Sequence, residues 1–197
     1  MLYADFVAQY DQPEIVVLLL GKRKIVPGEQ HLLEDLGAKL ASTTKHILFR
    51  SGNAGGADEL FAAAVSKVNQ DRIEVVTPYL GHRKKYSEQY KTISLDQIDL
   101  ASEPELTYHA KKDNPSVNLV KRYENGFRDY TAMKGAYLLR DTLMVVGAQG
   151  LNVPKASFAI FYDDLTKPKD GGTGHTMRVC SSLGIPFIDQ RVWLEWI

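Results

Sequence analysis

Ser51-Gly52-Asn53-Ala54-Gly55-Gly56-Ala57-Asp58 is the stretch that decides how this 197-residue chain folds. It follows a short apolar run at 46–49 and precedes an alanine-rich segment at 59–68, so it joins a predicted strand to a predicted helix. Glycines at such a corner let the backbone approach a ligand closely, and the N–H groups that open a helix attract anions. The stretch therefore predicts an anion-binding turn in an α/β fold.

A second glycine-rich stretch has the same setting. Gly171-Gly172-Thr173-Gly174-His175-Thr176 lies between an apolar run at 157–162 and a predicted helix at 173–183. In a parallel sheet, ligands bind at the carboxyl ends of the strands, near the point where the strand order switches. Because both turns follow predicted strands, we expect the fold to bring them together although they are far apart in sequence.

The remaining pattern supports a parallel sheet. Glu14–Leu20 (EIVVLLL) is a continuous apolar run rich in β-branched residues, as expected for a strand covered on both faces. Further strands are predicted at 46–49, 73–77, 142–146, 157–162 and 185–188, and helices at 29–41, 59–68, 128–139 and 173–183. Alternating strands and helices predict an α/β fold, a Rossmann-like parallel sheet with helices on both faces.

One segment, 78–127, interrupts this alternation. It is polar, carries the basic clusters His82-Arg83-Lys84-Lys85 and Lys111-Lys112, contains five tyrosines and shows no clear strand. A connection of that length without structure is uncommon in a compact domain. We therefore predict one Rossmann-like domain over residues 1–197, with 78–127 inserted in it as a partly helical lid.

The composition narrows the possible partners. Lys plus Arg and Asp plus Glu number 24 each, so the net charge is zero and we expect nucleic acid to be an unlikely partner.

The single cysteine, Cys180, excludes an intramolecular disulfide and a cysteine-built zinc site, and we expect it to pack in the core. No metal-ligand spacing and no cofactor motif stands out. The chain has no leader-like start and no long apolar run, so we expect a cytoplasmic protein that is not bound to a membrane. Whether it forms a homodimer is left open.

The first turn and the end of the first strand supply one half of the candidate ligand site. Glycine backbone would approach the ligand, Ser51 and Asn53 would hydrogen-bond phosphate or sugar oxygens, and Asp58 would contact a ribose hydroxyl or simply cap the helix. Two cations at the end of the first strand would form a third wall. The candidates in this half are Gly21, Lys22, Arg23, Ser51, Gly52, Asn53, Gly55, Gly56 and Asp58.

The second turn supplies the other half. Thr173 and Thr176 offer hydroxyl groups, His175 could hold a phosphate or act as an acid or base, and Arg178 lies one helical turn further on. The candidates in this half are Gly171, Gly172, Thr173, Gly174, His175, Thr176 and Arg178.

These motifs resemble those of the Rossmann-like SLOG superfamily, which includes the lonely-guy phosphoribohydrolases and the DNA-processing proteins of transformation. The stretch 51–58 (SGNAGGAD) is similar to the SGGAxGAD turn of that group, and 171–176 with Leu183-Gly184-Ile185-Pro186 is similar to its second turn, helix and closing strand. The resemblance implies a nucleotide or nucleotide-derived ligand at the two turns. The phosphoribohydrolase motif PGGxGTxxE ends in a catalytic glutamate, whereas this chain has Arg178 at that position.

The leading hypothesis from the sequence is a sensor or processing protein that binds a small nucleotide or nucleotide-derived ligand at the two turns. One alternative is a phosphoribohydrolase-like enzyme that cleaves the N-glycosidic bond of a nucleotide. Because arginine cannot serve as the carboxylate, Asp58, Glu59, Asp163 and Asp164 are then the candidates. The other alternative is a protein that handles single-stranded nucleic acid through the 78–127 segment.

Overall fold

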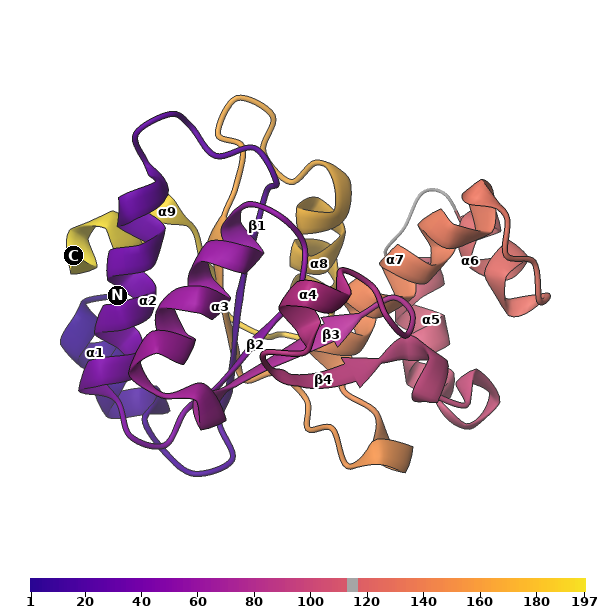
Figure 1. Ribbon diagram of the computed structural model, residues 1–197, viewed down its shortest axis with the longest axis horizontal. Helices are drawn as coiled ribbons and strands as arrows, with labels where there is room; N and C mark the ends of the chain where they lie inside the picture. The colour runs from indigo at the N-terminus through magenta and orange to yellow at the C-terminus, as the bar shows by residue number, and fades with distance from the viewer. Residues whose placement is uncertain (113–116) are drawn as a thin grey trace.

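The computed structural model describes residues 1–112 and 117–197, and its centre is a six-stranded sheet with every neighbouring pair parallel (Figure 1). The strand order is β4-β3-β2-β1-β5-β6. The strands are β1 (Val16–Gly21), β2 (Leu48–Ser51), β3 (Ile73–Thr77), β4 (Lys91–Ser94), β5 (Phe158–Tyr162) and β6 (Phe187–Ile188). The chain builds four strands toward one edge and then returns to place β5 on the other side of β1. This order confirms the predicted Rossmann-like sheet.

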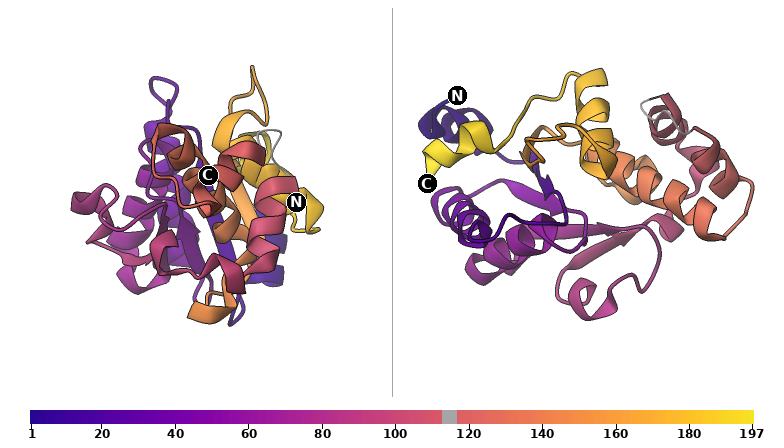
Figure 2. Two further views of the ribbon diagram at one scale, coloured as in Figure 1. Left: turned by 90° about the vertical axis from the view of Figure 1, so that its right-hand side faces the viewer. Right: turned by 90° about the horizontal axis from the view of Figure 1, so that it is seen from above.

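Helices cover both faces of the sheet (Figure 2). The main helices are α1 (Tyr3–Tyr10), α2 (Gln30–Thr43), α3 (Ala57–Val68), α5 (Pro104–Lys112), α6 (Val117–Glu124), α7 (Tyr130–Val146) and α8 (Gly171–Ser182), with the short helices α4 (Lys84–Ser87) and α9 (Gln190–Trp193). One core contains residues of α1, α2, α3 and α9, and the other contains residues of α5, α6, α7 and α8. Figures 1 and 2 show α5 and α6 beyond α7, at the end of the molecule away from both termini.

The apolar run of β1 is explained by this double covering. Val17 and Leu19 point into the core beneath α2 and α3, whereas Val16, Leu18 and Leu20 point into the core beneath α7 and α8. Each of the five side chains is at most 3% exposed. A strand with water on one face would instead alternate apolar and polar residues.

The predicted strand at 142–146 was wrong, because these residues form the last turns of α7. Asp129 begins this 17-residue helix by accepting hydrogen bonds from the N–H groups of Thr131 and Ala132. Ala132, Ala136, Leu139 and Leu143 are fully buried, and their spacing of three to four residues continues across the predicted boundary. A short apolar run does not by itself distinguish a strand from a buried helix.

The 78–127 segment contains a strand that the sequence did not reveal. Lys91–Ser94 pairs with β3 and becomes an edge of the sheet. Its first two residues are exposed and its last two buried, so it lacks a regular apolar pattern. The rest of the described segment is helical or irregular, and α6 packs on α7. The boundaries 78–127, and one domain over 1–197, stay predictions.

Two further features bear on function. No helix in the described ranges is long and apolar enough to cross a membrane. Cys180 is fully buried in α8, as expected, and burial raises the pKa of its thiol to about 12.

Candidate functional site

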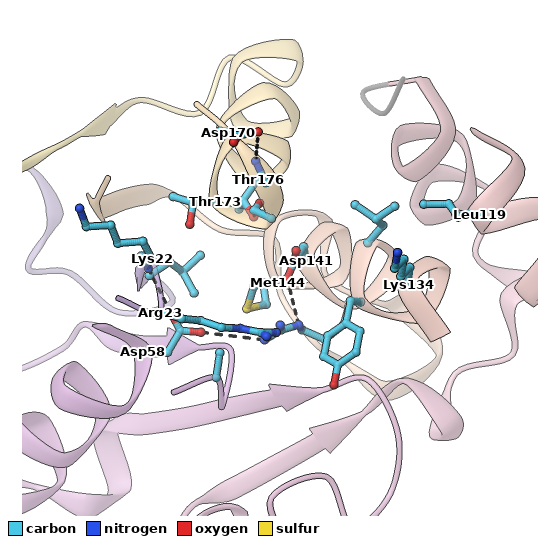
Figure 3. Close-up of a pocket in the computed structure, with 18 of the residues that line it drawn as sticks. Lys22, Arg23, Asp58, Leu119, Lys134, Asp141, Met144, Asp170, Thr173 and Thr176 are labelled. Atoms are coloured by element: carbon cyan, nitrogen blue, oxygen red, sulfur yellow. Dashed lines mark hydrogen bonds and ion pairs between the residues drawn. The ribbon is translucent and has the colours of Figure 1, made fainter. Parts of the chain in front are cut away.

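A cavity of about 980 Å³ opens at the carboxyl ends of the strands, beside the point where β1 lies between β2 and β5 (Figure 3). The connections that leave β1 and β5 lead to opposite sides of the sheet, which leaves a crevice between them. Residues from the end of β1, the start of α3, α7 and the start of α8 form most of its wall. The cavity is lined by Leu20, Gly21, Lys22, Arg23, Ala54, Asp58, Tyr79, Leu119, Tyr130, Met133, Lys134, Tyr137, Leu138, Arg140, Asp141, Met144, Asp170, Gly171, Gly172, Thr173, Thr176 and Arg178.

The floor of the cavity is organised around the guanidinium of Arg140. Its Nη1 donates a hydrogen bond to the carbonyl of Gly52 and lies 4.0 Å from Oδ2 of Asp58. Its Nε lies 3.0 Å from Oδ1 of Asp141, an ion pair without the angle of a hydrogen bond. All three charged side chains are less than 10% exposed. The end of β2, the start of α3 and the middle of α7 are thus tied together.

Burial controls the charge of the two carboxyl groups. Removal from water raises the pKa of Asp58 to about 6, although the Arg140 charge and the Gly21 N–H oppose the shift. Burial raises the pKa of Asp141 to about 6 as well, against the charges of Arg140 and Arg23. Both groups therefore change charge just below neutral pH, inside the cavity.

One face of α7 carries aromatic and basic side chains toward the cavity. Tyr130 is 78% exposed, and Nζ of Lys134 lies 4.6 Å from its ring centroid. Tyr137 lies about one helical turn beyond Lys134, and Arg140 lies about two turns beyond it. Both line the same wall. The Tyr137 ring lies 5.8 Å from the guanidinium carbons of both Arg23 and Arg140. This face offers rings for stacking and cations for phosphate in one place.

A neutral histidine supports the Tyr137 hydroxyl from behind. His82 Nε2 lies 3.2 Å from that hydroxyl oxygen. Burial, followed by the charges of Arg140, Arg83 and Arg23, lowers the pKa of His82 to about 4. Because His82 is neutral at pH 7, its Nε2 can accept a hydrogen bond from the hydroxyl group. Tyr137 is thereby held by its tip while its ring remains on the cavity wall.

The opposite wall is the N-terminus of α8. Asp170 caps this helix by accepting from the Gly171 N–H, and Gly171 and Gly172 are exposed. The second glycine-rich stretch is thus the first turn and a half of a helix rather than a separate loop. Figure 3 shows Thr173 and Thr176 on this wall above the cavity, Asp58 below it, and Lys22 and Lys134 on its two sides. A helix N-terminus with exposed glycines favours an anion.

The structure brings many of the predicted residues together. Those that line the cavity are Gly21, Lys22, Arg23, Asp58, Gly171, Gly172, Thr173, Thr176 and Arg178. Gly52 adjoins them through Arg140. Gly56 has φ +84°, and a side chain there would collide with the backbone of Arg23, so this glycine shapes the turn. A ligand role for each of these residues stays a prediction.

Four of the predicted residues have other tasks. Ser51 is fully buried and donates to the carbonyl of Leu19, and Asn53 is buried and donates to the carbonyl of His82. His175, expected to face the ligand, is instead fully buried, with Nε2 2.9 Å from the Thr142 hydroxyl. Helical geometry turns this side chain to the inner face of α8. Gly174 is also buried there, against the backbone of Lys169.

Gly55 and three of the four carboxylates considered for hydrolysis do not line the cavity. Gly55 and Glu59 lie beside Arg83, and Glu59 pairs with it at 2.8 Å. Asp163 accepts from the N–H of Lys169. Of the four carboxylates considered, Asp58 is the one that lines the cavity. Arg178, which stands where the phosphoribohydrolase motif has its glutamate, lines the cavity as well.

One face of α7 supplies cavity residues that were not predicted from the sequence. Tyr130, Met133, Lys134, Tyr137 and Asp141 follow the i, i+3, i+4, i+7, i+11 spacing of one helical face. All but Asp141 lie inside the predicted helix at 128–139, and Met144 is the cavity residue that lies in the stretch predicted as a strand. Leu119 from α6 and Tyr79 after β3 carried no comparable signal.

The cavity does not suggest a metal centre. In the part of the chain that the structure describes, no three His, Cys, Asp or Glu residues are grouped so that they could hold a metal ion. Its acidic side chains are engaged with Arg140 and with the N-terminus of α8.

No protein-family model matches the chain, and no curated protein matches it in sequence. Its fold is similar to that of DNA processing protein A from Helicobacter pylori, a solved structure concerned with single-stranded DNA binding, with a TM-score of 0.53 and 13% identity. The similarity covers 90% of this chain and 65% of that protein, so the chain spans less than two thirds of its neighbour's length. At this identity the likeness shows a shared Rossmann-like fold.

This neighbour corrects the expected partners. We expected a small nucleotide-derived ligand and considered nucleic acid an unlikely partner. This expectation was wrong, because the same fold occurs in a single-stranded DNA-binding protein. The expectation rested on a net charge of zero over the whole chain. Whole-chain charge does not describe a cavity wall, and this one gathers Lys22, Arg23, Lys134 and Arg178.

Proposed function

We propose that the cavity binds a single strand of nucleic acid. The observation that carries this proposal is the pairing of two walls: the N-terminus of α8 on one side, and the aromatic and basic face of α7 on the other. Proteins that bind single strands combine cations that follow the phosphates with aromatic rings that stack on the bases. A site for phosphate alone would not need the tyrosines.

The phosphate contacts would come from α8 and the end of β1. Exposed Gly171 and Gly172 allow close approach to the first N–H groups of the helix, and Thr173 and Thr176 add hydroxyl groups. Lys22 and Arg23 face the same space from the end of β1. Arg140 is already balanced by Asp58 and Asp141, so its task is to hold the floor.

The bases would contact α7. The exposed ring of Tyr130 and the ring of Tyr137 lie on one helical face, with Lys134 beside the first. Every base has an aromatic face, so stacking here would tolerate different sequences. The shared fold with a single-stranded DNA-binding protein and the motif at 51–58 support this proposal, and with it membership of the SLOG superfamily.

Fluorescence anisotropy with a labelled twelve-nucleotide thymidine strand tests the proposal. Wild-type protein should bind it at low salt, with an affinity that falls as salt rises. Gly172→Asp, which places a carboxylate at the start of α8, should weaken binding at least tenfold. Asn69→Asp adds the same charge to an exposed residue at the far end of α3 and should leave the affinity unchanged.

The aromatic contribution has its own matched pair. Tyr130→Ala should weaken binding about fivefold or more, because a stacked base contributes roughly 1–3 kcal/mol. Tyr108→Ala removes another exposed tyrosine, from α5 and outside the cavity lining, and should have no effect. Failure of the wild type to bind any single strand at low salt would reject the proposal.

A further inference from the structure

A second, smaller cavity adjoins the first. Its volume is about 350 Å³, and it is lined by Tyr79, Asp96, Tyr123, Arg128 and Met133. Tyr79 and Met133 line both cavities, so the two spaces share a wall. The volume lies near the lower end of the range for small-molecule sites, about 300–1,000 Å³. The residues come from the 78–127 segment and the adjoining start of α7.

The position of Arg128 is fixed by its neighbours. Its Nη1 donates to the carbonyls of Tyr123 and Phe127, at 3.0 and 2.9 Å. Its guanidinium carbon lies 4.0 Å from the centroid of the Tyr123 ring. The residue makes no direct ion pair with a carboxylate of the described chain.

The far wall is also ordered. Asp96 accepts from the N–H of Leu80 at 2.8 Å and lies 3.4 Å from the hydroxyl of buried Tyr123. These contacts fix the Asp96 side chain at the wall of this cavity. A carboxylate offers acceptors only, so it suits the amino group of a base and repels a phosphate. Arg128 and Asp96 thus mark a phosphate end and a base end of one small space.

We propose that this second cavity holds the neighbouring nucleotide of the strand bound in the main cavity, with its phosphate at Arg128 and its base between Tyr79 and Asp96. The inference rests on the proposed function. It deepens that function, because the ligand is then a strand of at least two nucleotides that passes over the wall formed by Tyr79 and Met133. Bases readily stack on tyrosine rings, which Tyr79 supplies, while the Arg128 guanidinium would hold the phosphate.

Competition against the labelled twelve-nucleotide strand tests the inference. The probes are deoxycytidine monophosphate, its 5′-phosphorylated dinucleotide, and the same dinucleotide without its second base. Wild-type protein should bind the dinucleotide about tenfold more tightly than the mononucleotide, and removal of the second base should abolish most of that gain. Arg128→Ala should bind the mononucleotide like the wild type but lose the gain from the second nucleotide.

Controls separate this site from the main one. Lys121→Ala removes an exposed cation of α6 outside both cavities and should keep the tenfold step. Arg128→Lys retains the charge without the planar group and should keep part of it, and thermal unfolding shows whether each variant is folded. An unchanged step in folded Arg128→Ala, while Gly172→Asp still loses the twelve-nucleotide strand, would overturn the second site alone. Absence of wild-type binding to every probe would instead reject the proposed function.

Discussion

The carboxylate of Asp58 accepts a hydrogen bond of 3.0 Å from the backbone N–H of Gly21. Gly21 ends β1 and Asp58 lies in the first turn of α3, so one contact joins two of the segments that converge on the cavity. The same carboxylate faces Arg140 of α7. Asp58 is therefore best understood as the residue that assembles the floor, in addition to its position at a helix N-terminus.

Replacement of Asp58 should reveal this structural role. Asp58→Ala leaves the Gly21 N–H without its acceptor and Arg140 with a single carboxylate, so we expect a loss of about 2–4 kcal/mol in the free energy of unfolding at pH 7.5. Asp58→Asn keeps an acceptor for Gly21 and should lose less. Urea unfolding measures both, with Asp35→Ala on the exposed face of α2 as the control. Equal stability of Asp58→Ala and wild type would contradict the assignment.

The raised pKa values of Asp58 and Asp141, each about 6, predict how stability changes with pH. Between the ordinary pKa of 3.8 and about 6, the folded state binds more protons than the unfolded state. The stabilisation linked to protonation of these two groups is thus fully present below pH 3.8 and is lost as the pH rises through 6. Asp141→Asn should reduce the difference in unfolding free energy between pH 4.5 and 6.5 by about 1–2 kcal/mol.

Binding should follow the same titration. Protonation of Asp58 and Asp141 removes negative charge from the cavity, so affinity for a single strand should increase as the pH falls from 7 to 5, by about threefold or more. A thymidine strand without a terminal phosphate is the appropriate ligand, because it does not titrate in this range. Asp141→Asn should flatten the profile. A profile that is identical in the variant would show that this carboxylate does not act on the bound strand.

Two glycines of the first turn provide a matched pair. A Cβ atom at Gly52 would collide with Nη1 of Arg140 and lie 2.6 Å from Oδ2 of Asp58, whereas one at Gly55 would meet nothing closer than 4.0 Å. Gly52→Ala should therefore displace the Arg140–Asp58 pair and cost about 1–3 kcal/mol. Gly55→Ala should change stability by less than about 0.5 kcal/mol. Thermal unfolding of the two variants side by side decides whether close approach is required at Gly52.

Much of the sheet was predictable because its strands are buried on both faces. Val16 to Leu20 carry an uninterrupted apolar run, and Ile73–Thr77 was predicted to the residue. The edge strand at Lys91–Ser94 was not found, because a strand that is half exposed at a sheet edge needs only two buried side chains. Its identity depends on pairing with β3, which local sequence does not record.

The parts of the candidate site that depend on backbone geometry could be predicted from the sequence. The two glycine-rich stretches, with Lys22 and Arg23, follow strand ends, so the parallel topology alone brings their surroundings together. Tyr130, Lys134 and Tyr137 lie inside the predicted helix at 128–139, but their place at the cavity depends on the packing of α7 against α8, which local sequence does not record. His175 was misplaced because its orientation depends on helical phase rather than on the neighbouring glycines.

The buried thiol of Cys180 makes the protein convenient for site-directed labelling. The thiolate is the reactive form of cysteine, and a pKa of about 12 in a fully buried side chain leaves almost none at neutral pH. Since Cys180 is the single cysteine of the chain, cysteines introduced at exposed positions would be the thiols that react with a maleimide dye. Paired fluorophores on α6 and α2 could then follow the distance between the two ends of the molecule without prior removal of native cysteine.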